Sequence, residues 1–160
     1  MRTRRPSPAA EHLRLDAQLC FALYATSLAM TKLYKPLLAP LGLTYPQYLV
    51  MLVLWEQDDR TVQELGELLQ LDSGTLTPLL KRMEAAGQLS RHRDPADERR
   101  VRILLTPTGK ALREQAQGIP GAILCQAGLE GNALATLRTQ LHALRQQLQG
   151  QDEAPEREGP

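Results

Sequence analysis

Residues 61–105 read TVQELGELLQLDSGTLTPLLKRMEAAGQLSRHRDPADERRVRILL, and this stretch decides the fold. It begins with a capping box, because the Thr61 hydroxyl can accept from the Glu64 N–H while the Glu64 side chain reaches back to Thr61. The apolar face of the helix that follows is formed by Leu65, Leu68 and Leu69. The stretch therefore opens with a short amphipathic helix.

A second helix is predicted over residues 74–86. Asp72 and Ser73 supply N-cap oxygens before it, and Gly87 can end it. Its inward-facing residues are Leu76, Leu79, Leu80 and Met83. Its outer face is polar and basic and carries Ser73, Thr75, Thr77, Lys81 and Arg82. Two short helices of this kind are typical of a helix-turn-helix whose second helix enters the major groove of DNA.

Two strands and a charged loop follow the second helix. Residues 89–93 and 100–105 are the predicted strands, and residues 94–99 form the tip of the hairpin. A helix-turn-helix followed by a basic hairpin is a winged helix, whose wing can reach the minor groove. Residues 73–105 carry seven basic and four acidic residues, a net charge of +3 that is modest for a nucleic-acid surface. An ordinary solvated surface would also explain these arginines, so the order of the elements favours DNA binding more than the charge does.

The sequences DSGTLTPLLKRMEAAG and DERRVRILLTPTGK resemble the recognition helix and wing of the MarR family of dimeric repressors. Within that family the chain is most similar to the organic-hydroperoxide sensors (OhrR type), over residues 13–148. The resemblance implies that Arg99 enters the minor groove and that Arg100 either contacts DNA or pairs with Asp97 to brace the wing. The implied major-groove positions are Ser73, Thr75, Thr77, Pro78, Lys81 and Arg82. Pro78 lies in the first turns of its helix, where proline is tolerated.

The expected fold is mainly α with a small β-wing (α+β). A chain of 160 residues suits a single domain, predicted over residues 12–149. The winged helix spans about residues 45–105, between dimerisation helices at about 13–38 and 106–149. Residues 1–11 are basic with two prolines and are expected to be a disordered arm, and residues 150–160 a disordered acidic tail.

Helix 13–38 is apolar around much of its circumference, so it needs cover on several sides, and a homodimer supplies that cover. Pro40 and Gly42 end it, and Thr44 caps a helix over residues 45–56. The residues of that helix expected to pack under the helix-turn-helix are Leu49, Leu52, Val53 and Trp55. Residues 106–126 and 132–149 are predicted to be helical, with interruptions around 118–121 and 128–131.

Several classes of protein are disfavoured. No apolar run is long enough to span a bilayer and no signal peptide is visible, so we expect a cytoplasmic protein. Two cysteines far apart in the chain do not make a disulfide framework. His12, His92 and His142 are too scattered for a zinc site or a catalytic dyad, so we expect neither a metal nor a cofactor.

Cys20 is the candidate sensor residue. A free cysteine is commonly a small buried hydrophobe, and that reading stands beside the functional one. Tyr24 lies one turn on, whereas Tyr34 lies fourteen positions later, hence about 21 Å along a continuous helix. In the sensor family a cysteine at this place hydrogen-bonds tyrosines of the partner subunit. The resemblance assigns these roles to Cys20, Tyr34 and Tyr45, with Tyr24 as a further member of the pocket.

The chemistry fits these residue types. A thiolate is the nucleophile, and phenol O–H groups can stabilise it and hold the reacting oxygen of a peroxide. Apolar neighbours such as Phe21, Leu23 and Met51 would favour organic peroxides over hydrogen peroxide. Asp16, four residues before Cys20, would oppose thiolate formation, so activation must come from residues brought in by the fold. Each tyrosine could instead be a core aromatic with a satisfied O–H, and for Tyr24 both readings remain open.

Cys125 matches the second cysteine that some members of the family carry. The resemblance implies that Cys20 is oxidised to sulfenic acid and then condenses with Cys125 of the other subunit. Such a bond would re-space the two recognition helices and release operator DNA. Sulfenic acid and a mixed disulfide remain alternative end states. Two other functions also remain: a repressor released by a small aromatic ligand with inert cysteines, and a thiol peroxidase, which the lack of a CxxC motif and of a thioredoxin-like pattern disfavours.

Overall fold

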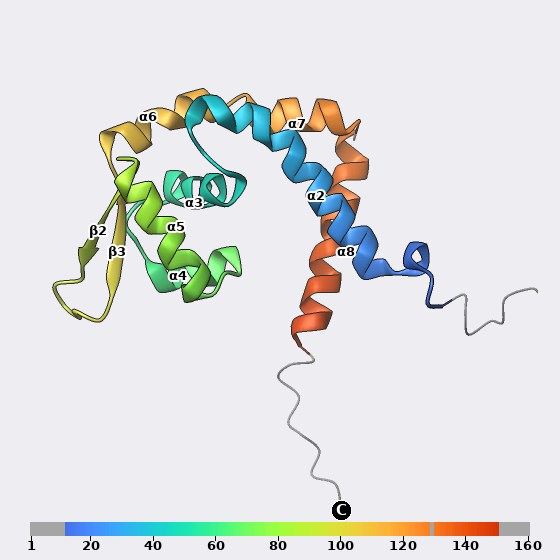
Figure 1. The fold of residues 1–160 in the computed structure, drawn as a ribbon, viewed down its shortest axis with the longest axis horizontal. Coiled ribbons are helices and arrows are strands. Elements are labelled where there is room, and N and C mark those ends of the chain that lie inside the picture. Colours follow the sequence, from blue (N-terminus) through green and yellow to red (C-terminus); the bar gives the residue numbers. More distant parts are fainter. Residues whose placement is uncertain (1–11, 129, 151–160) are drawn as a thin grey trace, which may run out of the picture. The chain divides into compact units, whose positions relative to one another are not determined.

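The computed structural model describes residues 12–128 and 130–150, so the predicted arm at residues 1–11 and nearly all of the predicted tail lie outside the described residues (Figure 1). The chain divides into two compact units, Met1–Ile119 and Pro120–Pro160. The first unit contains η1 (Leu15–Ala17), α2 (Leu19–Leu38), η2 (Ala39–Leu41), α3 (Tyr45–Glu56), β1 (Arg60–Thr61), α4 (Val62–Leu69), α5 (Ser73–Ala85), β2 (Leu89–Arg93), β3 (Val101–Leu105) and α6 (Pro107–Ala116). Helices α7 (Ile119–Ala127) and α8 (Gly131–Gln149) follow. The predicted class, mainly helical with a small β-wing, is confirmed.

The sheet has three antiparallel strands in the order β1-β3-β2. The hairpin pairs Leu89 with Leu105 and Arg93 with Val101, and at its tip the Arg100 N–H donates to the Asp97 carbonyl at 2.8 Å. The short strand β1 adds to the other edge of β3 and was not predicted. Its two residues are too few to show the period-two pattern that marks a strand.

Side-chain caps define the helices of this region. The Glu64 N–H donates to Thr61 Oγ1 at 3.2 Å and the Thr61 N–H to Glu64 Oε2 at 2.7 Å, so the predicted capping box is confirmed. Asp72 caps α5 by accepting from the Thr75 N–H at 2.8 Å, and Gly87, at φ +72°, follows its end. The predicted boundaries of α5 are therefore correct to within one residue.

The core of the first unit lies between α3, α4, α5 and the sheet. Its fully buried side chains include Met51, Leu54, Leu65, Leu76, Leu80, Met83, Leu89 and Ile103. The predicted buried face of α3 is wrong, because Tyr48, Val50, Met51 and Leu54 are buried while Leu52 is 40% exposed. Helix α3 is apolar on nearly all sides, so periodicity could not select its inner face. Leu68 of α4 was likewise expected inside and is exposed.

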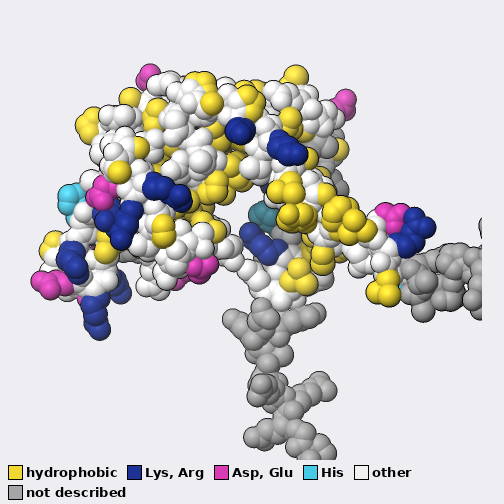
Figure 2. Space-filling view, in the orientation of Figure 1, with side chains coloured by type: hydrophobic (Ala, Val, Ile, Leu, Met, Phe, Trp, Pro, Cys, Tyr) yellow, Lys and Arg dark blue, Asp and Glu magenta, His cyan; other side chains and the backbone are white. Residues whose placement is uncertain are grey.

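Helix α2 begins at Leu19 rather than at residue 13. Gln18 is extended, and its side-chain amide donates to the carbonyls of His12 and Arg14 at 2.6 and 2.9 Å, which ends the preceding 3-10 turn. From Leu19 to Leu38 the helix is continuous. Several large apolar side chains of α2 are exposed in the single chain: Leu19, Phe21, Tyr24 and Leu28. Figure 2 shows hydrophobic side chains gathered over α2.

The second unit holds most of α7 and all of α8. The predicted interruption near residue 118 is real, since α6 ends at Ala116 and α7 begins at Ile119, but Ile119, Pro120 and Gly121 open the new helix rather than break it. Gly128, at φ +62°, follows α7. Helix α8 leaves Leu137, Leu141 and Leu148 exposed within its own unit.

No single helix among residues 12–128 and 130–150 is both long and apolar enough to cross a bilayer. The segments Leu19–Leu41 and Tyr45–Glu56 reach that hydropathy only as a pair bent by 67°. Within this pair, α3 supplies Val50, Met51 and Leu54 to the core of the first unit, which accounts for its apolar sequence.

Gly109 supports a first prediction. A Cβ added to Gly109 would overlap the backbone carbonyl oxygen of Gln88, and backbone cannot move aside as a flexible side chain can. We expect Gly109→Ala to lower the free energy of unfolding in urea by about 2 kcal/mol or more. Gly118→Ala is the control, because a Cβ there meets no atom within 4 Å. Equal effects of the two substitutions would contradict the predicted clash.

Candidate functional site

Helix α5 has one buried face and one exposed face. Leu76, Leu79, Leu80 and Met83 are buried against the rest of the first unit. On the opposite side the exposed residues are Ser73, Thr75, Pro78, Lys81 and Arg82, while Thr77 is half-buried. The face predicted to contact DNA is thus free in the single chain, and it presents hydroxyl groups and two cations.

Asp97 organises the tip of the wing. Its carboxylate accepts from the Arg99 N–H at 3.1 Å and lies 3.2 Å from Arg99 Nε and 3.7 Å from Arg100 Nε. The expected pair of Arg100 with Asp97 is therefore present, and Arg99 pairs with the same carboxylate. The Arg99 side chain remains 92% exposed, and an exposed ion pair of this kind is weak, so it does not hold Arg99 back from another anion.

Two arginines of the same region are engaged inside the wing. Arg91 Nε donates to Glu84 at 2.8 Å. Arg102 Nε donates to Asp59 Oδ1 at 2.7 Å, and its Nη1 donates to Asp94 at 3.3 Å. The hydrogen bond from Arg102 lowers the pKa of Asp59, and the pKa of Arg102 is raised in turn. Counting charges in the sequence therefore overestimates the basic surface, which consists of Lys81, Arg82, Arg93, Arg99 and Arg100.

A groove of about 230 Å³ lies between the start of α4, the helix α5 and the wing. Arg99, Arg100 and Thr77 line it together with residues 61–63. Figure 2 shows Lys and Arg side chains gathered around the wing. This side of the first unit therefore suits a polyanion.

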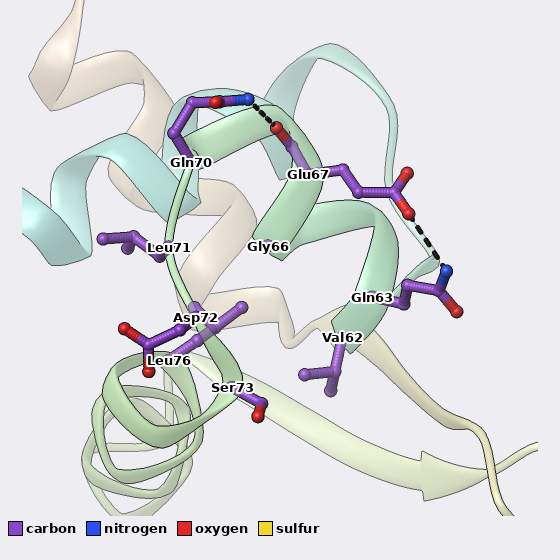
Figure 3. A pocket seen from close by; sticks show the side chains of 9 residues that line it. All are labelled: Val62, Gln63, Gly66, Glu67, Gln70, Leu71, Asp72, Ser73 and Leu76. Carbon is purple, nitrogen blue, oxygen red and sulfur yellow. Dashed lines mark hydrogen bonds between the residues drawn. The ribbon is translucent and has the colours of Figure 1, made fainter. Parts of the chain in front are cut away.

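A larger groove, of about 680 Å³, lies between α4 and α5 (Figure 3). In Figure 3 its walls include Val62, Leu71 and Leu76, and Glu67 accepts from the Gln63 amide at 3.0 Å. Its charged lining residues are Glu67 and Asp72, and no Lys or Arg lines it. This groove does not suit a phosphate, so the candidate anion surface is the wing side of α5.

Four aromatic rings pack in series inside the first unit. The ring centroids are 4.6 Å apart for Tyr34 and Tyr45, 5.8 Å for Tyr34 and Tyr48, and 6.3 Å for Tyr48 and Trp55. The structure thus brings together two of the expected sensor tyrosines. The phenols of Tyr34, Tyr45 and Tyr48 are hydrogen-bond donors at neutral pH, and burial raises the pKa of each further above its ordinary value of 10.0.

Tyr48 was missed by the sequence reasoning. It is 2% exposed and packs between Tyr34 and Trp55. Its position three residues after Tyr45 places the two on neighbouring turns of one helix face, and that spacing was the available signal.

Cys20 is exposed in the first turn of α2, and Phe21 and Tyr24 beside it are exposed as well. Because α2 is continuous, fourteen residues separate Cys20 from Tyr34 by about 21 Å along the axis. A single chain does not bring the thiol to the tyrosine pair. Cys125 is also exposed, on α7.

Two expected neighbours of Cys20 are placed differently. Met51 is fully buried in the core of the first unit and is not exposed as Cys20 is, and its expected place in the sensor pocket stays a prediction. Asp16 lies in η1, before the extended Gln18, and not one turn below Cys20 on the same helix. Its exposed carboxylate pairs with Arg14 at 2.6 Å.

A third groove, of about 420 Å³, opens beside Tyr45. Leu38, Leu43 and Pro46 form apolar walls, and Lys32 and Lys35 stand at its side. Elsewhere, the part of the chain that the structure describes holds no group of three or more His, Cys, Asp or Glu placed to bind a metal.

Comparison with known proteins places the chain among transcriptional regulators. The family model of the transcriptional regulators SarA/Rot matches residues 32–116. The "Organic hydroperoxide resistance transcriptional regulator" of Bacillus subtilis is 53% identical over 134 residues, which are 84% of this chain and 91% of the relative.

Solved structures agree with this placement. The structure of reduced AbfR bound to DNA superposes with a TM-score of 0.74 at 36% identity, covering 90% of this chain and 99% of AbfR. A structure of AbfR with a disulfide formed superposes with a TM-score of 0.57 at 35% identity, covering 91% and 97%.

The Asp59–Arg102 pair generates a pH prediction. Because the pKa of Asp59 is lowered below 3.8 in the folded chain, its contribution to stability is complete above 3.8 and is lost as the pH falls through the lower folded-state value. We expect the free energy of unfolding of Asp59→Asn to fall less than that of the wild type between neutral pH and about pH 3. In an Arg102→Met background the same substitution should leave the pH dependence unchanged. Parallel curves for wild type and Asp59→Asn would contradict the assignment.

Proposed function

Because the chain belongs to the MarR-type family of winged-helix transcriptional regulators that includes SarA/Rot, we propose that it is a dimeric repressor that organic hydroperoxides release from operator DNA. The observation that carries the proposal is the half-buried Tyr34–Tyr45 pair, with ring centroids 4.6 Å apart, in a chain whose Cys20 cannot reach it. A second copy of the chain would bring a thiol to these phenols. Binding to chromosomal operators places the protein in the cytoplasm.

Operator binding uses α5 and the wing. The exposed hydroxyls of Ser73 and Thr75 and the cations of Lys81 and Arg82 enter the major groove, where polar side chains read base edges. Arg99 and Arg100 reach the minor groove and its phosphates from the wing. The DNA-bound structure of AbfR, at 36% identity, supports this mode of binding.

The sensing step is a two-electron oxidation of Cys20. The thiolate attacks the terminal oxygen of a hydroperoxide, the O–O bond breaks, and the alkoxide takes a proton and leaves as an alcohol, while Cys20 becomes a sulfenic acid. The first turn of α2 supports this chemistry, because free backbone N–H groups and the helix dipole favour an anion there. The protonated phenols of Tyr34 and Tyr45 donate hydrogen bonds to the reacting groups, and Tyr24 and Phe21 flank the thiol.

A disulfide with Cys125 of the other subunit completes the cycle. The Cys125 thiol attacks the sulfenic sulfur, water leaves, and the S–S bond forms. Exposure of both cysteines and the uncovered leucines of α2 and α8 support this pairing within a homodimer. The relative AbfR is known with a disulfide formed, which supports an end state of this kind.

A second candidate function has its own observation. The groove beside Tyr45 combines apolar walls with Lys32 and Lys35, which suits a small aromatic carboxylate. Such a ligand would release DNA without oxidation of Cys20. We do not propose a thiol peroxidase, because the family consists of transcriptional regulators.

Arg99 tests the proposed contact with DNA. We expect Arg99→Ala to weaken operator binding by about 1–3 kcal/mol and to reduce the salt dependence of binding, because a cation at the groove is lost. Fluorescence anisotropy at several salt concentrations gives both quantities. Arg113→Ala, an exposed arginine of α6 away from this surface, is the control and should bind like the wild type. If Arg99→Ala binds operator as tightly as the wild type, the proposed contact between Arg99 and DNA is wrong.

Cys20 tests the sensor. We expect cumene hydroperoxide to release wild-type protein from labelled operator DNA and a reductant to restore binding, while Cys20→Ser stays bound, because serine cannot form a sulfenic acid. Cys125→Ser should lose the disulfide-linked dimer seen on a non-reducing gel. Wild-type protein that stays bound after oxidant would refute the redox mechanism. Release of Cys20→Ser by a phenolic carboxylate would favour the second candidate function.

A further inference from the structure

The stack of rings that begins at the proposed sensor extends beyond it. Tyr34 contacts both Tyr45 and Tyr48, and Tyr48 contacts Trp55 about two helical turns further along α3. Tyr48 is 2% exposed, so its ring has no solvent into which it can swing. Because Tyr48 is closely packed, a displacement of Tyr34 toward it cannot be absorbed by empty space and is passed on.

The far end of this stack is fixed to another helix. The indole Nε1–H of Trp55 donates to the backbone carbonyl of Gly109 in α6 at 2.9 Å. Gly109 in turn lies so close to the carbonyl of Gln88 that no side chain fits between them. A movement of the indole would therefore displace Gly109 through this hydrogen bond. Gly109 would in turn displace Gln88, because their backbones are in direct contact.

Gly87, Gln88, Thr106 and Gly109 form the point where the DNA-facing elements join, here called the junction. The Gln88 N–H donates to the Met83 carbonyl of α5 at 3.0 Å, and the Thr106 hydroxyl donates to the Gly87 carbonyl at 2.6 Å. Strand β2 begins directly after Gln88, and β3 ends directly before Thr106. The end of α5, both strands of the wing and the start of α6 thus share one set of backbone contacts.

We infer that Tyr48 and Trp55 are positioning residues that transmit the state of the Tyr34–Tyr45 pair to the junction and thereby set the orientation of α5 and the wing. The inference rests on the proposed function, since it assumes that oxidation of Cys20 changes what the phenols of Tyr34 and Tyr45 bind. The phenols then shift, Tyr48 and Trp55 follow, and the hydrogen bond to Gly109 carries the shift to the base of the wing. Coupling of this kind is a difference in free energy between two arrangements, so it is measured as a ratio of affinities.

Two pairs of variants isolate this role. Trp55→Phe keeps an aromatic ring but removes the N–H that Gly109 accepts, and Leu52→Ala, on the exposed side of α3, is its control. Tyr48→Leu removes the middle ring, and Tyr48→Phe keeps it. Each protein is reduced or oxidised with cumene hydroperoxide, Cys20 oxidation is followed by mass spectrometry, and operator affinity is measured by anisotropy in both states.

We expect Trp55→Phe, Leu52→Ala and Tyr48→Phe to be oxidised at Cys20 at the rate of the wild type, because each keeps the ring that packs against Tyr34. In Trp55→Phe and Tyr48→Leu the ratio of reduced to oxidised affinity should fall by about tenfold relative to wild type, while Leu52→Ala and Tyr48→Phe keep the full ratio. A residue that only stabilised the fold would lower both affinities together and leave the ratio unchanged. Trp55 is the single tryptophan, so its emission should change on oxidation in the wild type and not in Tyr48→Leu.

The outcomes separate this inference from the function on which it rests. If the ratio of reduced to oxidised operator affinity is the same for Trp55→Phe as for the wild type, the inference is overturned and the proposed sensor stands. Wild-type protein that is not oxidised at Cys20, or that stays on DNA when oxidised, overturns both. If Tyr48→Leu does not fold, Trp55→Phe and its control still decide between these outcomes.

Discussion

The close backbone contact between Gly109 and Gln88 is the constraint on which the winged helix depends. Gln88 ends the segment that leaves α5, and Gly109 lies in the first turn of α6, so their contact closes the loop formed by the whole hairpin. The Thr106 hydroxyl strengthens the closure by donating to the Gly87 carbonyl while it accepts from the Gly109 N–H. With both ends of the hairpin held in this way, the wing is a fixed extension of the helical core rather than a free loop.

The arginines of the wing differ in how exposed their ion pairs are. Arg91 and Arg102 are tied to carboxylates that reach them from α5, from the α3–β1 turn and from the hairpin itself. Arg99 and Arg100 share the single carboxylate of Asp97 at the tip and stay exposed. The half-exposed pairs join the wing to α5 and to the α3–β1 turn, and the weak outer pairs are the ones that a phosphate can replace.

The sequence predicted the elements whose signals are local. The capping box at Thr61 and Glu64, the inner face of α5 and the hairpin are each encoded within a few residues, and each is observed. Prediction from the sequence failed where the residues carry no pattern, or where the pattern depends on residues far apart in the chain. Helix α3 is apolar on most sides, so Tyr48 and Leu54 could not be distinguished from Leu52, and the two residues of β1 carry no pattern. The partners of Arg102 could not be predicted either, because Asp59 lies 43 residues away and meets it only after folding.

The continuity of α2 explains why the proposed sensor is divided between two chains. An unbroken helix holds Cys20 about 21 Å from Tyr34, and no rotamer of either residue spans that distance. The tyrosine pair is instead built into the packing of α2 against α3, where it touches Tyr48 and the path to the junction. A change in a thiol supplied by a second chain would therefore reach the core of this chain through the packed rings. Each chain holds its own Cys20 too far from its own tyrosines, so in the proposed sensor the thiol of one chain meets the rings of the other and the dimer is the unit that senses.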